Sequence, residues 1–267
     1  MSVMSVSSER KAPMTKMRFG LGLSASRLLL IAAVLALWQL AVSAGWMAPA
    51  SMSSPVLVGR RLYEMFASGM IWPHLIDTLG AAVIALVLSA VAGLALGMAL
   101  YRWPLLEATL NPLLVAINGI PRVAFGPLIV LFLGVGITAK VALAVSIALF
   151  VFTTNVLEGM RQIDPMLRRH FLLMGAGRWQ TFAMVTGPSL VTWMWAAVDL
   201  AIGLCLIGVI ICEFISSTSG LGHLISAASM GFDTTGVVAL LVIIVVATVI
   251  FRIVLIALRS WLAPWSQ

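Results

Sequence analysis

Charged residues are scarce in this 267-residue sequence, and their scarcity excludes the soluble fold classes. Only 9% of the residues are Asp, Glu, Lys or Arg, whereas 62% are hydrophobic. A soluble globular domain carries about 25% charged and roughly 45–50% apolar residues. With so few charged side chains the chain cannot cover its apolar surface in water. We therefore predict an integral membrane protein.

Cysteines are also few, and bases outnumber acids. The two cysteines, Cys205 and Cys212, lie about 10 Å apart along a helix, which is too far for a disulfide, so we expect buried thiols. The 16 bases against 9 acids give a net charge of +7. Because the bases flank apolar runs, as they do when they set membrane topology, we expect no nucleic-acid partner.

Enzymatic motifs are missing as well. None of the three lysines follows a glycine, so the sequence has no phosphate-binding loop with which to hydrolyse ATP. His74, His170 and His223 are far apart and lack the spacing of zinc ligands, and no Gly-x-Ser-x-Gly elbow occurs. We therefore predict that this chain is not an enzyme and holds no metal ion or cofactor of its own.

Six apolar runs are long enough to cross a bilayer, which takes about 20 residues for about 30 Å of hydrocarbon. The runs cover residues 28–46, 78–101, 108–134, 141–157, 191–214 and 235–258. We predict an all-α fold in which six transmembrane helices form one domain at 28–262, after a basic tail at 1–27 and before a short end at 263–267. The amphipathic stretch at 56–70 predicts an interfacial helix.

The first apolar run has two interpretations. The Ala-Pro-Ala sequence at 48–50 resembles the cleavage site of a signal peptide. However, the run is longer than the apolar core of a usual signal peptide, and a proline occupies the site. We favour an anchor helix that is not cleaved.

The distribution of Lys and Arg predicts how the helices are oriented. If the N terminus is cytoplasmic, 12 of the 16 bases fall in inside segments, and only Arg60, Arg61 and Lys140 fall in outside loops. Bases favour the cytoplasmic side of a membrane. Both termini and the charged loop at 158–189 are therefore predicted to be cytoplasmic, with Lys140 in a turn between two spans.

Small residues in the second predicted span indicate close helix packing. Gly93 and Gly97 form a small-xxx-small pair, which lets another helix approach closely. The many methionines and tryptophans, 15 and 9, are expected to serve packing and interfacial anchoring.

Three charged residues within or beside the spans are candidates for a substrate pathway: Arg122, Asp199 and Glu213. Pro121 and the Gly-Pro pair at 126–127 break the helix around Arg122, and broken helices commonly line substrate routes. Arg122 can bind an anion there, or it lies near the interface between membrane and water, or it pairs with an acid such as Asp199. Glu213 stabilises the following loop, caps backbone donors or contacts substrate.

The loop at 158–189 predicts a short amphipathic helix. Asp164 is a good N-cap and Pro165 suits the first helical position. Leu167, Phe171 and Met174 recur at i, i+4 and i+7 and predict one apolar face.

Two glycines and a Gly-Pro pair divide this loop into two predicted helices. Gly175 and Gly177 can adopt positive φ and end the first helix. A second amphipathic helix with Trp179 and Phe182 follows, and the Gly-Pro pair at 187–188 ends it. Such helices lie on a lipid surface or dock into a partner's groove, and the pattern leaves both open.

The same loop resembles the cytoplasmic signature of binding-protein-dependent ABC importer permeases: Glu-Ala-Ala, three residues, Gly, nine residues, Ile-x-Leu-Pro. Gly175 stands at the glycine, and Val-Thr-Gly-Pro at 185–188 follows at the required distance. Other segments are similar to the nitrate/sulfonate/taurine branch, which also includes carriers of pyrimidine precursors. These are Trp-Pro-His-Leu at 72–75, Leu-Phe-Leu-Gly-Val-Gly at 131–136, Gln-Ile-Asp-Pro at 162–165 and Ser-Gly-Leu-Gly at 219–222.

The sequence departs from this signature in charge and size. Arg169, His170 and Phe171 stand where the family has Glu-Ala-Ala, and Gly187 replaces the Leu before the closing proline. Asp199 falls where a basic residue is expected early in the fifth helix. These exchanges alter the fit of the loop, and they are either compensating changes or chance divergence.

The resemblance implies an ABC type I importer permease in a bacterial inner membrane. Its partners would be a second permease copy in a homodimer, two cytoplasmic ABC ATPase subunits that hold ATP and Mg²⁺, a periplasmic or extracellular solute-binding protein, and the lipid bilayer. A small, anionic solute (sulfonate, nitrate or taurine-like) or a pyrimidine precursor would move inward by alternating access. The residues implied in coupling to the ATPase are Asp164, Leu167, Arg169, His170, Phe171, Met174 and Gly175.

Two other functions remain open from the residues alone. An ion-coupled secondary transporter would need acids at mid-membrane, and only Asp199 qualifies clearly. A membrane-embedded structural or assembly protein would need neither a pathway charge nor a partner groove.

Overall fold

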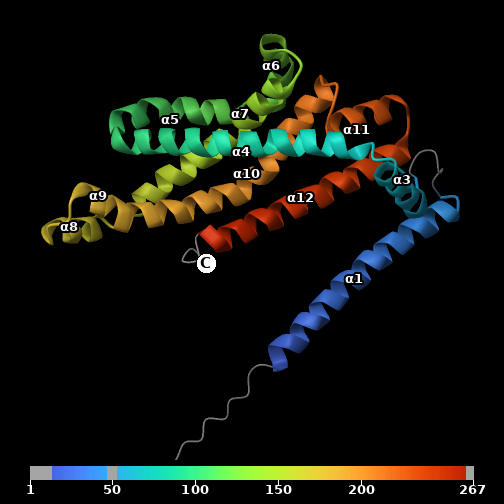
Figure 1. The fold of residues 1–267 in the computed structure, drawn as a ribbon, viewed down its shortest axis with the longest axis horizontal. Helices are drawn as coiled ribbons and strands as arrows, with labels where there is room; N and C mark the ends of the chain where they lie inside the picture. Colours follow the sequence, from blue (N-terminus) through green and yellow to red (C-terminus); the bar gives the residue numbers. More distant parts are fainter. Residues whose placement is uncertain (1–13, 47–52, 263–267) are drawn as a thin grey trace, which may run out of the picture. The chain divides into compact units, whose positions relative to one another are not determined.

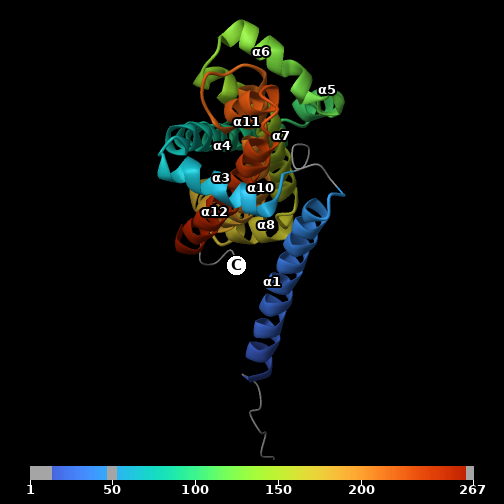
Figure 2. The same ribbon diagram turned by 90° about the vertical axis from the view of Figure 1, so that its right-hand side faces the viewer.

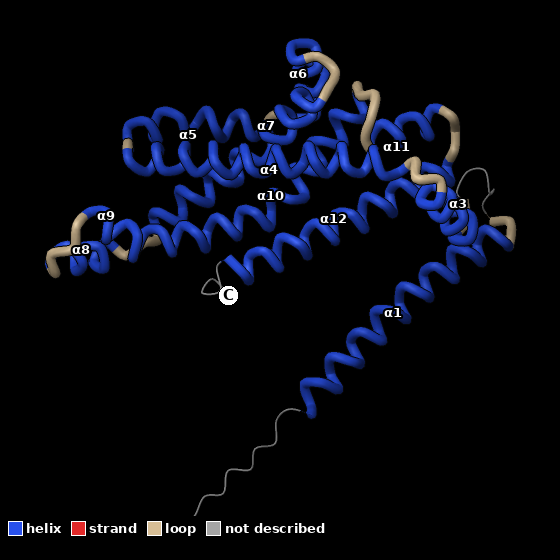
Figure 3. The backbone as a smooth tube through the Cα atoms, viewed as in Figure 1, coloured by secondary structure: helices blue, strands red, loops and turns tan. Residues whose placement is uncertain are grey.

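The computed structural model describes residues 14–46 and 53–262 of the 267, and the elements in these ranges are all helical (Figure 1, Figure 3). The predicted all-α class is confirmed. The described chain separates into two compact units, Met1–Arg60 and Arg61–Gln267. The predicted tail at 1–27 lies partly, and the end at 263–267 wholly, outside the described residues.

The described residues of the first unit contain one long helix and the start of a second. Helix α1 spans Met14–Ser43 and overlaps the first predicted span. Helix α3 spans Pro55–Ala67, as the amphipathic stretch predicts, and continues into the second unit. Its N terminus is capped by Ser54, whose hydroxyl accepts a hydrogen bond from the Leu57 N–H at 3.3 Å.

Among the described residues of the second unit, four helices are long and apolar enough to cross a membrane. They contain α4 (Ile71–Arg102), α7 (Ile137–Arg161), α10 (Gly187–Ile215) and α12 (Thr234–Leu262). The end-on view in Figure 2 shows these helices gathered into one bundle. The described apolar part of α1, Leu29–Ser43, is shorter, so the count of six spans stays a prediction.

The core of the bundle is built from small side chains on α4, α7 and α10. Alanines from all three helices are fully buried, among them Ala82, Ala144 and Ala201. A Cβ added at Gly97 would lie 2.7 Å from the Cβ of Val156, and one added at Gly93 would overlap Phe152. Helix α7 therefore passes α4 at the close distance that the spacing of these glycines predicts.

The third predicted span is not one helix. Helix α5 (Pro104–Gly119) reverses direction after α4, and a 3₁₀ turn, η1 (Arg122–Phe125), leads into α6 (Gly126–Leu133) (Figure 1). Ile120 is extended, because a residue before proline disfavours the helical region, and Pro121 is extended as well. The predicted break at Pro121 is confirmed, whereas Gly126 and Pro127 begin a helix and do not interrupt one.

Candidate functional site

The two ends of the bundle carry the charged and exposed residues that sequence reasoning singled out. At one end the chain between α7 and α10 forms α8 (Pro165–Leu173) and α9 (Arg178–Thr181). At the other end, the chain between α10 and α12 forms α11 (Leu221–Met230) (Figure 1).

Helix α8 begins as its sequence predicts. The carboxylate of Asp164 accepts a hydrogen bond from the Met166 N–H at 2.7 Å, and Pro165 occupies the first turn. An N-cap of this kind satisfies a backbone donor that the helix cannot pair internally. The N terminus of α8 is thus fixed without help from other elements.

The C terminus of α8 is closed by a Schellman motif. Gly175 has φ +83°, its N–H donates to the Leu172 carbonyl at 3.1 Å, and the Ala176 N–H donates to the Phe171 carbonyl at 3.0 Å. The prediction for Gly177 is wrong, because its φ is −68°. Gly177 instead precedes α9 and donates its N–H to the Gln180 side chain at 2.8 Å.

The second helix of this loop does not end at the Gly-Pro pair. A π-helical turn, η2 (Phe182–Thr186), joins α9 to α10, so one continuous helix runs from Arg178 to Ile215. Pro188 has no N–H to donate to a preceding carbonyl and would interrupt a regular α-helix. The wider turn before Pro188 carries the helix across this position, and the predicted stop is therefore wrong.

The predicted apolar face of α8 is divided between the interior and the surface. Phe171 packs against a buried cluster of Val156, Met160, Ile163, Val185 and Leu190. Met174 is the C-cap residue of α8. Met174 is 85% exposed and Leu173 83% exposed, and Leu167 is exposed as well. Phe171 anchors the helix, whereas Leu173 and Met174 project from it.

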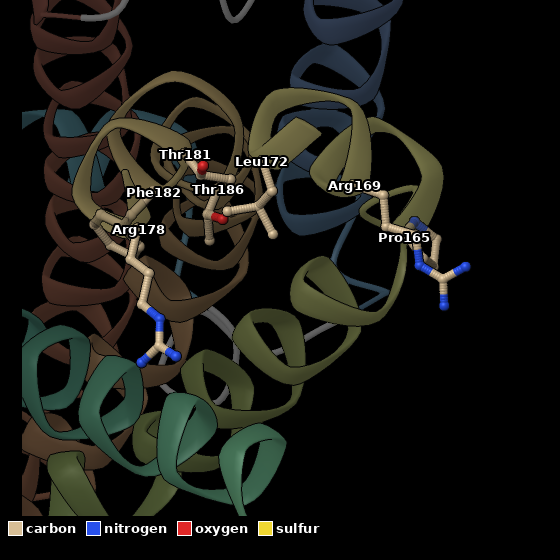
Figure 4. Close-up of a pocket in the computed structure, with 7 residues that line it drawn as sticks. All are labelled: Pro165, Arg169, Leu172, Arg178, Thr181, Phe182 and Thr186. Atoms are coloured by element: carbon tan, nitrogen blue, oxygen red, sulfur yellow. The ribbon is translucent and has the colours of Figure 1, made fainter. Parts of the chain in front are cut away.

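A hollow of about 460 Å³ lies between α8 and the α9–η2 segment (Figure 4). Its lining residues are Pro165, Arg169, Leu172, Arg178, Thr181, Phe182 and Thr186. Figure 4 shows Leu172 and the two threonines near its centre, with Arg169 and Arg178 on different sides of them. His170 is exposed on the same helix. We call α8, α9 and this hollow the α8–α9 tip.

The opposite end of the bundle holds a buried ionic cluster. Lys140 is 2% exposed, and its Nζ donates to Asp77 Oδ2 at 2.6 Å, to Glu213 Oε1 at 3.0 Å and to the Ser219 carbonyl at 2.9 Å. Lys140 lies in the first turn of α7, so the expectation that it lies in a turn between two spans is wrong. Its ammonium joins α4, α7, α10 and the following loop.

Glu213 is a structural cap within this ionic cluster. Glu213 is 1% exposed. Its carboxylate accepts hydrogen bonds from the Thr78 hydroxyl and the Gly222 N–H, both at 2.9 Å. The Thr78 hydroxyl in turn accepts from the Leu221 N–H at 2.8 Å. A carboxylate and a hydroxyl thus satisfy free donors at the start of α11. Of the roles considered for Glu213, the geometry supports loop stabilisation and capping.

Two of the histidines meet beside the cluster, contrary to the expectation that all three are far apart. The rings of His74 and His223 stack with centroids 6.4 Å apart, and His74 Nδ1 accepts from the Gly220 N–H at 3.0 Å. A hollow of about 280 Å³ lies next to them. Its polar lining comprises Glu213, Ser216, Ser217, Thr218, His223 and Ser226. No group of three metal-ligating side chains occurs among the described residues.

The remaining pathway candidates do not join the ionic cluster. Asp199 Oδ2 lies 3.8 Å from Arg259 Nη1 and forms an ion pair between α10 and α12. The side chain of Arg122 lies outside the described residues, and its backbone begins η1. Sequence reasoning missed Asp77, and the only signal for it was an acid near the start of an apolar run.

Comparison with known proteins places these features in a family. Residues 90–266 match the family described as binding-protein-dependent transport system inner membrane component. The chain is 32% identical over 248 residues to the riboflavin transport system permease protein RibX of Chloroflexus aurantiacus, covering 92% of this chain and 90% of that protein.

Two further relatives have other transported compounds in their names. The formylaminopyrimidine transport permease protein ThiX of Halalkalibacterium halodurans is 29% identical, covering 82% of this chain and 87% of that protein. The taurine transport system permease protein TauC of Escherichia coli is 25% identical, covering 88% and 87% respectively.

Proposed function

We propose a specific transport mechanism for this chain, which belongs to the family of binding-protein-dependent transport system inner membrane components. The chain is a permease subunit of an ABC importer and a multi-pass inner-membrane protein. It is not an enzyme, since ATP hydrolysis resides on a partner ATPase. The proposal concerns which residues couple to that ATPase, what solute is moved and how the permease assembles.

The α8–α9 tip is proposed to be the surface that the ATPase binds. The observation that carries this proposal is the exposure of Leu173 and Met174 at the end of a helix whose two termini are both capped. Apolar side chains on a rigid helix suit a hydrophobic groove of a partner protein. In this proposal Asp164 and Gly175 fix the two ends of α8, and Leu167 and Met174 contact the groove of the ATPase. Arg169 and His170 form the polar edge of the contact surface on the tip.

The connections of the tip suit it to transmit motion. Phe171 ties α8 to the buried cluster at the ends of α7 and α10. The α9 segment continues without a break into α10. A displacement of the tip by the ATPase would therefore tilt α10 directly, and this is the step that we propose for alternating access.

The solute is proposed to be a small organic molecule delivered by a binding protein. The names of the relatives refer to riboflavin, formylaminopyrimidine and taurine. An anionic solute would suit Arg122, which stands at the break between α5 and η1. Substitution Arg122→Ala should then reduce uptake at unchanged expression, and normal uptake would remove Arg122 from the pathway.

A homodimer with both termini in the cytoplasm completes the proposal. Symmetric dimers are the commonest form of oligomer, and a pathway between two copies would need few polar residues from each. Mass measurement of the purified complex with its lipids tests the number of permease copies. Labelling of single cysteines at the termini tests the orientation.

Reconstituted transport tests the proposed function as a whole. The permease would be placed in vesicles with its ATPase and binding protein, and solute uptake would be followed with and without ATP. We expect uptake only with all components, and loss of uptake in the double variant Leu173→Ser/Met174→Ser. Uptake driven by an ion gradient without the ATPase would contradict the proposal.

A further inference from the structure

The α8–α9 tip carries an excess of positive charge. Residues 164–189 contain Arg168, Arg169, His170 and Arg178, and the only acid among them is Asp164. The Asp164 carboxylate is already engaged as the N-cap of α8. Among the described side chains, neither Arg169 nor Arg178 forms an ion pair with Asp164.

Glu158, the acid nearest before this segment in the sequence, and the more distant Glu107 both pair with Arg161. Glu158 accepts a hydrogen bond from Arg161 Nη1 at 2.9 Å, and Glu107 pairs with the other terminal nitrogen of the same guanidinium. Among the described side chains, no acid lies within ion-pair distance of Arg169 or Arg178. Two guanidinium groups at the hollow thus lack a negative partner in this part of the chain.

The shape of the hollow favours a protruding side chain over a flat surface. Arg169 comes from α8 and Arg178 from α9, and Leu172 and Phe182 line the space together with two buried threonines. A planar guanidinium binds a carboxylate through two parallel hydrogen bonds. A flat layer of anionic lipid headgroups would meet the projecting arginines but would not enter the concave space between the helices.

We infer that the ATPase partner presents acidic side chains to the two sides of this hollow, where they pair with Arg169 and Arg178. The inference rests on the proposed docking of the tip and adds the chemistry of the partner. Arg169 stands where the related permease signature has Glu, so the permease charge at this position has the opposite sign. An acid on the ATPase that faces Arg169 would make the interface selective, since an ATPase with a base at this position would be repelled.

Charge-reversed variants test the inference in the assembled transporter. The full-length permease would be placed in nanodiscs of zwitterionic lipid, and the affinity of its purified ATPase would be measured at several salt concentrations. We expect Arg169→Glu/Arg178→Glu to weaken binding about tenfold or more at low salt, with a smaller effect at high salt. Arg102→Glu is the matched control, an exposed arginine outside the tip, and should bind like the wild type.

A compensating substitution gives the decisive result. Cross-linking from Arg169→Cys would locate the facing acid on the ATPase, since the native Cys205 and Cys212 are buried. Replacing that acid with arginine should restore binding to the single variant Arg169→Glu and weaken binding to the wild type. Failure of this exchange, or unchanged affinity of the charge-reversed permease, would overturn the inference.

The experiment separates this inference from the proposed function. If Leu173→Ser/Met174→Ser abolishes ATPase binding while charge reversal has no effect, docking stands and the acidic partner is refuted. If neither pair of substitutions changes ATPase binding, docking itself fails. A fluorophore at Met174→Cys that becomes buried only when anionic lipid is added would assign the tip to the membrane surface, which also overturns both.

Discussion

The two ends of the helical bundle use their charged residues in opposite ways. In the buried ionic cluster, the Lys140 ammonium has three acceptors within the chain, two of them carboxylates. At the α8–α9 tip, Arg169 and Arg178 stand at the edge of a hollow, beside exposed apolar side chains. The first arrangement is complete in itself, whereas the second is suited to a partner.

Because of this difference, we expect the ionic cluster to contribute to stability and the α8–α9 tip to contribute to binding of a partner. A buried charge that loses its partner is costly, so substitutions in the ionic cluster should lower the free energy of unfolding of the bundle. Replacing an exposed side chain changes the stability of the folded chain little. Substitutions of exposed residues at the tip should therefore weaken binding of the ATPase and leave the free energy of unfolding nearly unchanged.

Removal of the Lys140 ammonium should be the most damaging change. Lys140→Met leaves Asp77 and Glu213 next to each other without their shared cation, and we expect a loss of about 3–5 kcal/mol in the free energy of unfolding. Unfolding of the detergent-solubilised protein by denaturant measures this loss. A midpoint equal to that of the wild type would show that the cluster does not hold the helices together.

The triple variant Lys140→Met/Asp77→Asn/Glu213→Gln serves as the control for this prediction. It removes all three charges and leaves hydrogen-bonding groups at Asp77 and Glu213. Because no carboxylate is then left unpaired, we expect it to recover part of the lost stability. If it were as unstable as Lys140→Met alone, packing and not charge would explain the loss.

Close packing of α4 on α7 should contribute next. Gly97→Ala places a Cβ 2.7 Å from Val156, and overpacking of this kind costs about 1–3 kcal/mol. Gly80→Ala is the matched control on the same helix, because a Cβ there has nothing within 4 Å. The control should be neutral or more stable, since alanine favours a helix. Equal effects of the two substitutions would show that helix propensity, and not contact, decides.

Local features of the tip could be predicted from the sequence because they depend on neighbouring residues. Asp164 and Pro165 begin α8, and Gly175 ends it with a positive φ, as their types predict. The break at Pro121 follows from the same local rules. The stop predicted at the Gly-Pro pair at 187–188 is wrong because the continuing helix, through its π turn, overrides the local preference for a stop. The prediction for Gly177 is wrong because Gly175 alone ends α8, and Gly177 precedes the next helix.

The ionic cluster could not be predicted, because its members are distant in sequence. Lys140 lies 63 residues from Asp77 and 73 from Glu213. A lysine at the start of an apolar run has the same appearance whether it faces water or a buried carboxylate. The stacking of His74 on His223 could not be predicted for the same reason, because nothing in the sequence around either histidine indicates that the two rings lie close together.

Two residues on α8 provide the finest test of the contrast. Phe171→Ala removes a half-buried ring from the cluster beneath the helix, and we expect a loss of about 1–2 kcal/mol. Leu173→Ala changes a side chain that is 83% exposed, so the free energy of unfolding should stay within about 0.5 kcal/mol of the wild type. Denaturant unfolding and ATPase binding would be measured on both variants. Leu173→Ala should weaken binding without loss of stability, and a stability loss equal to that of Phe171→Ala would mean that the tip is part of the core.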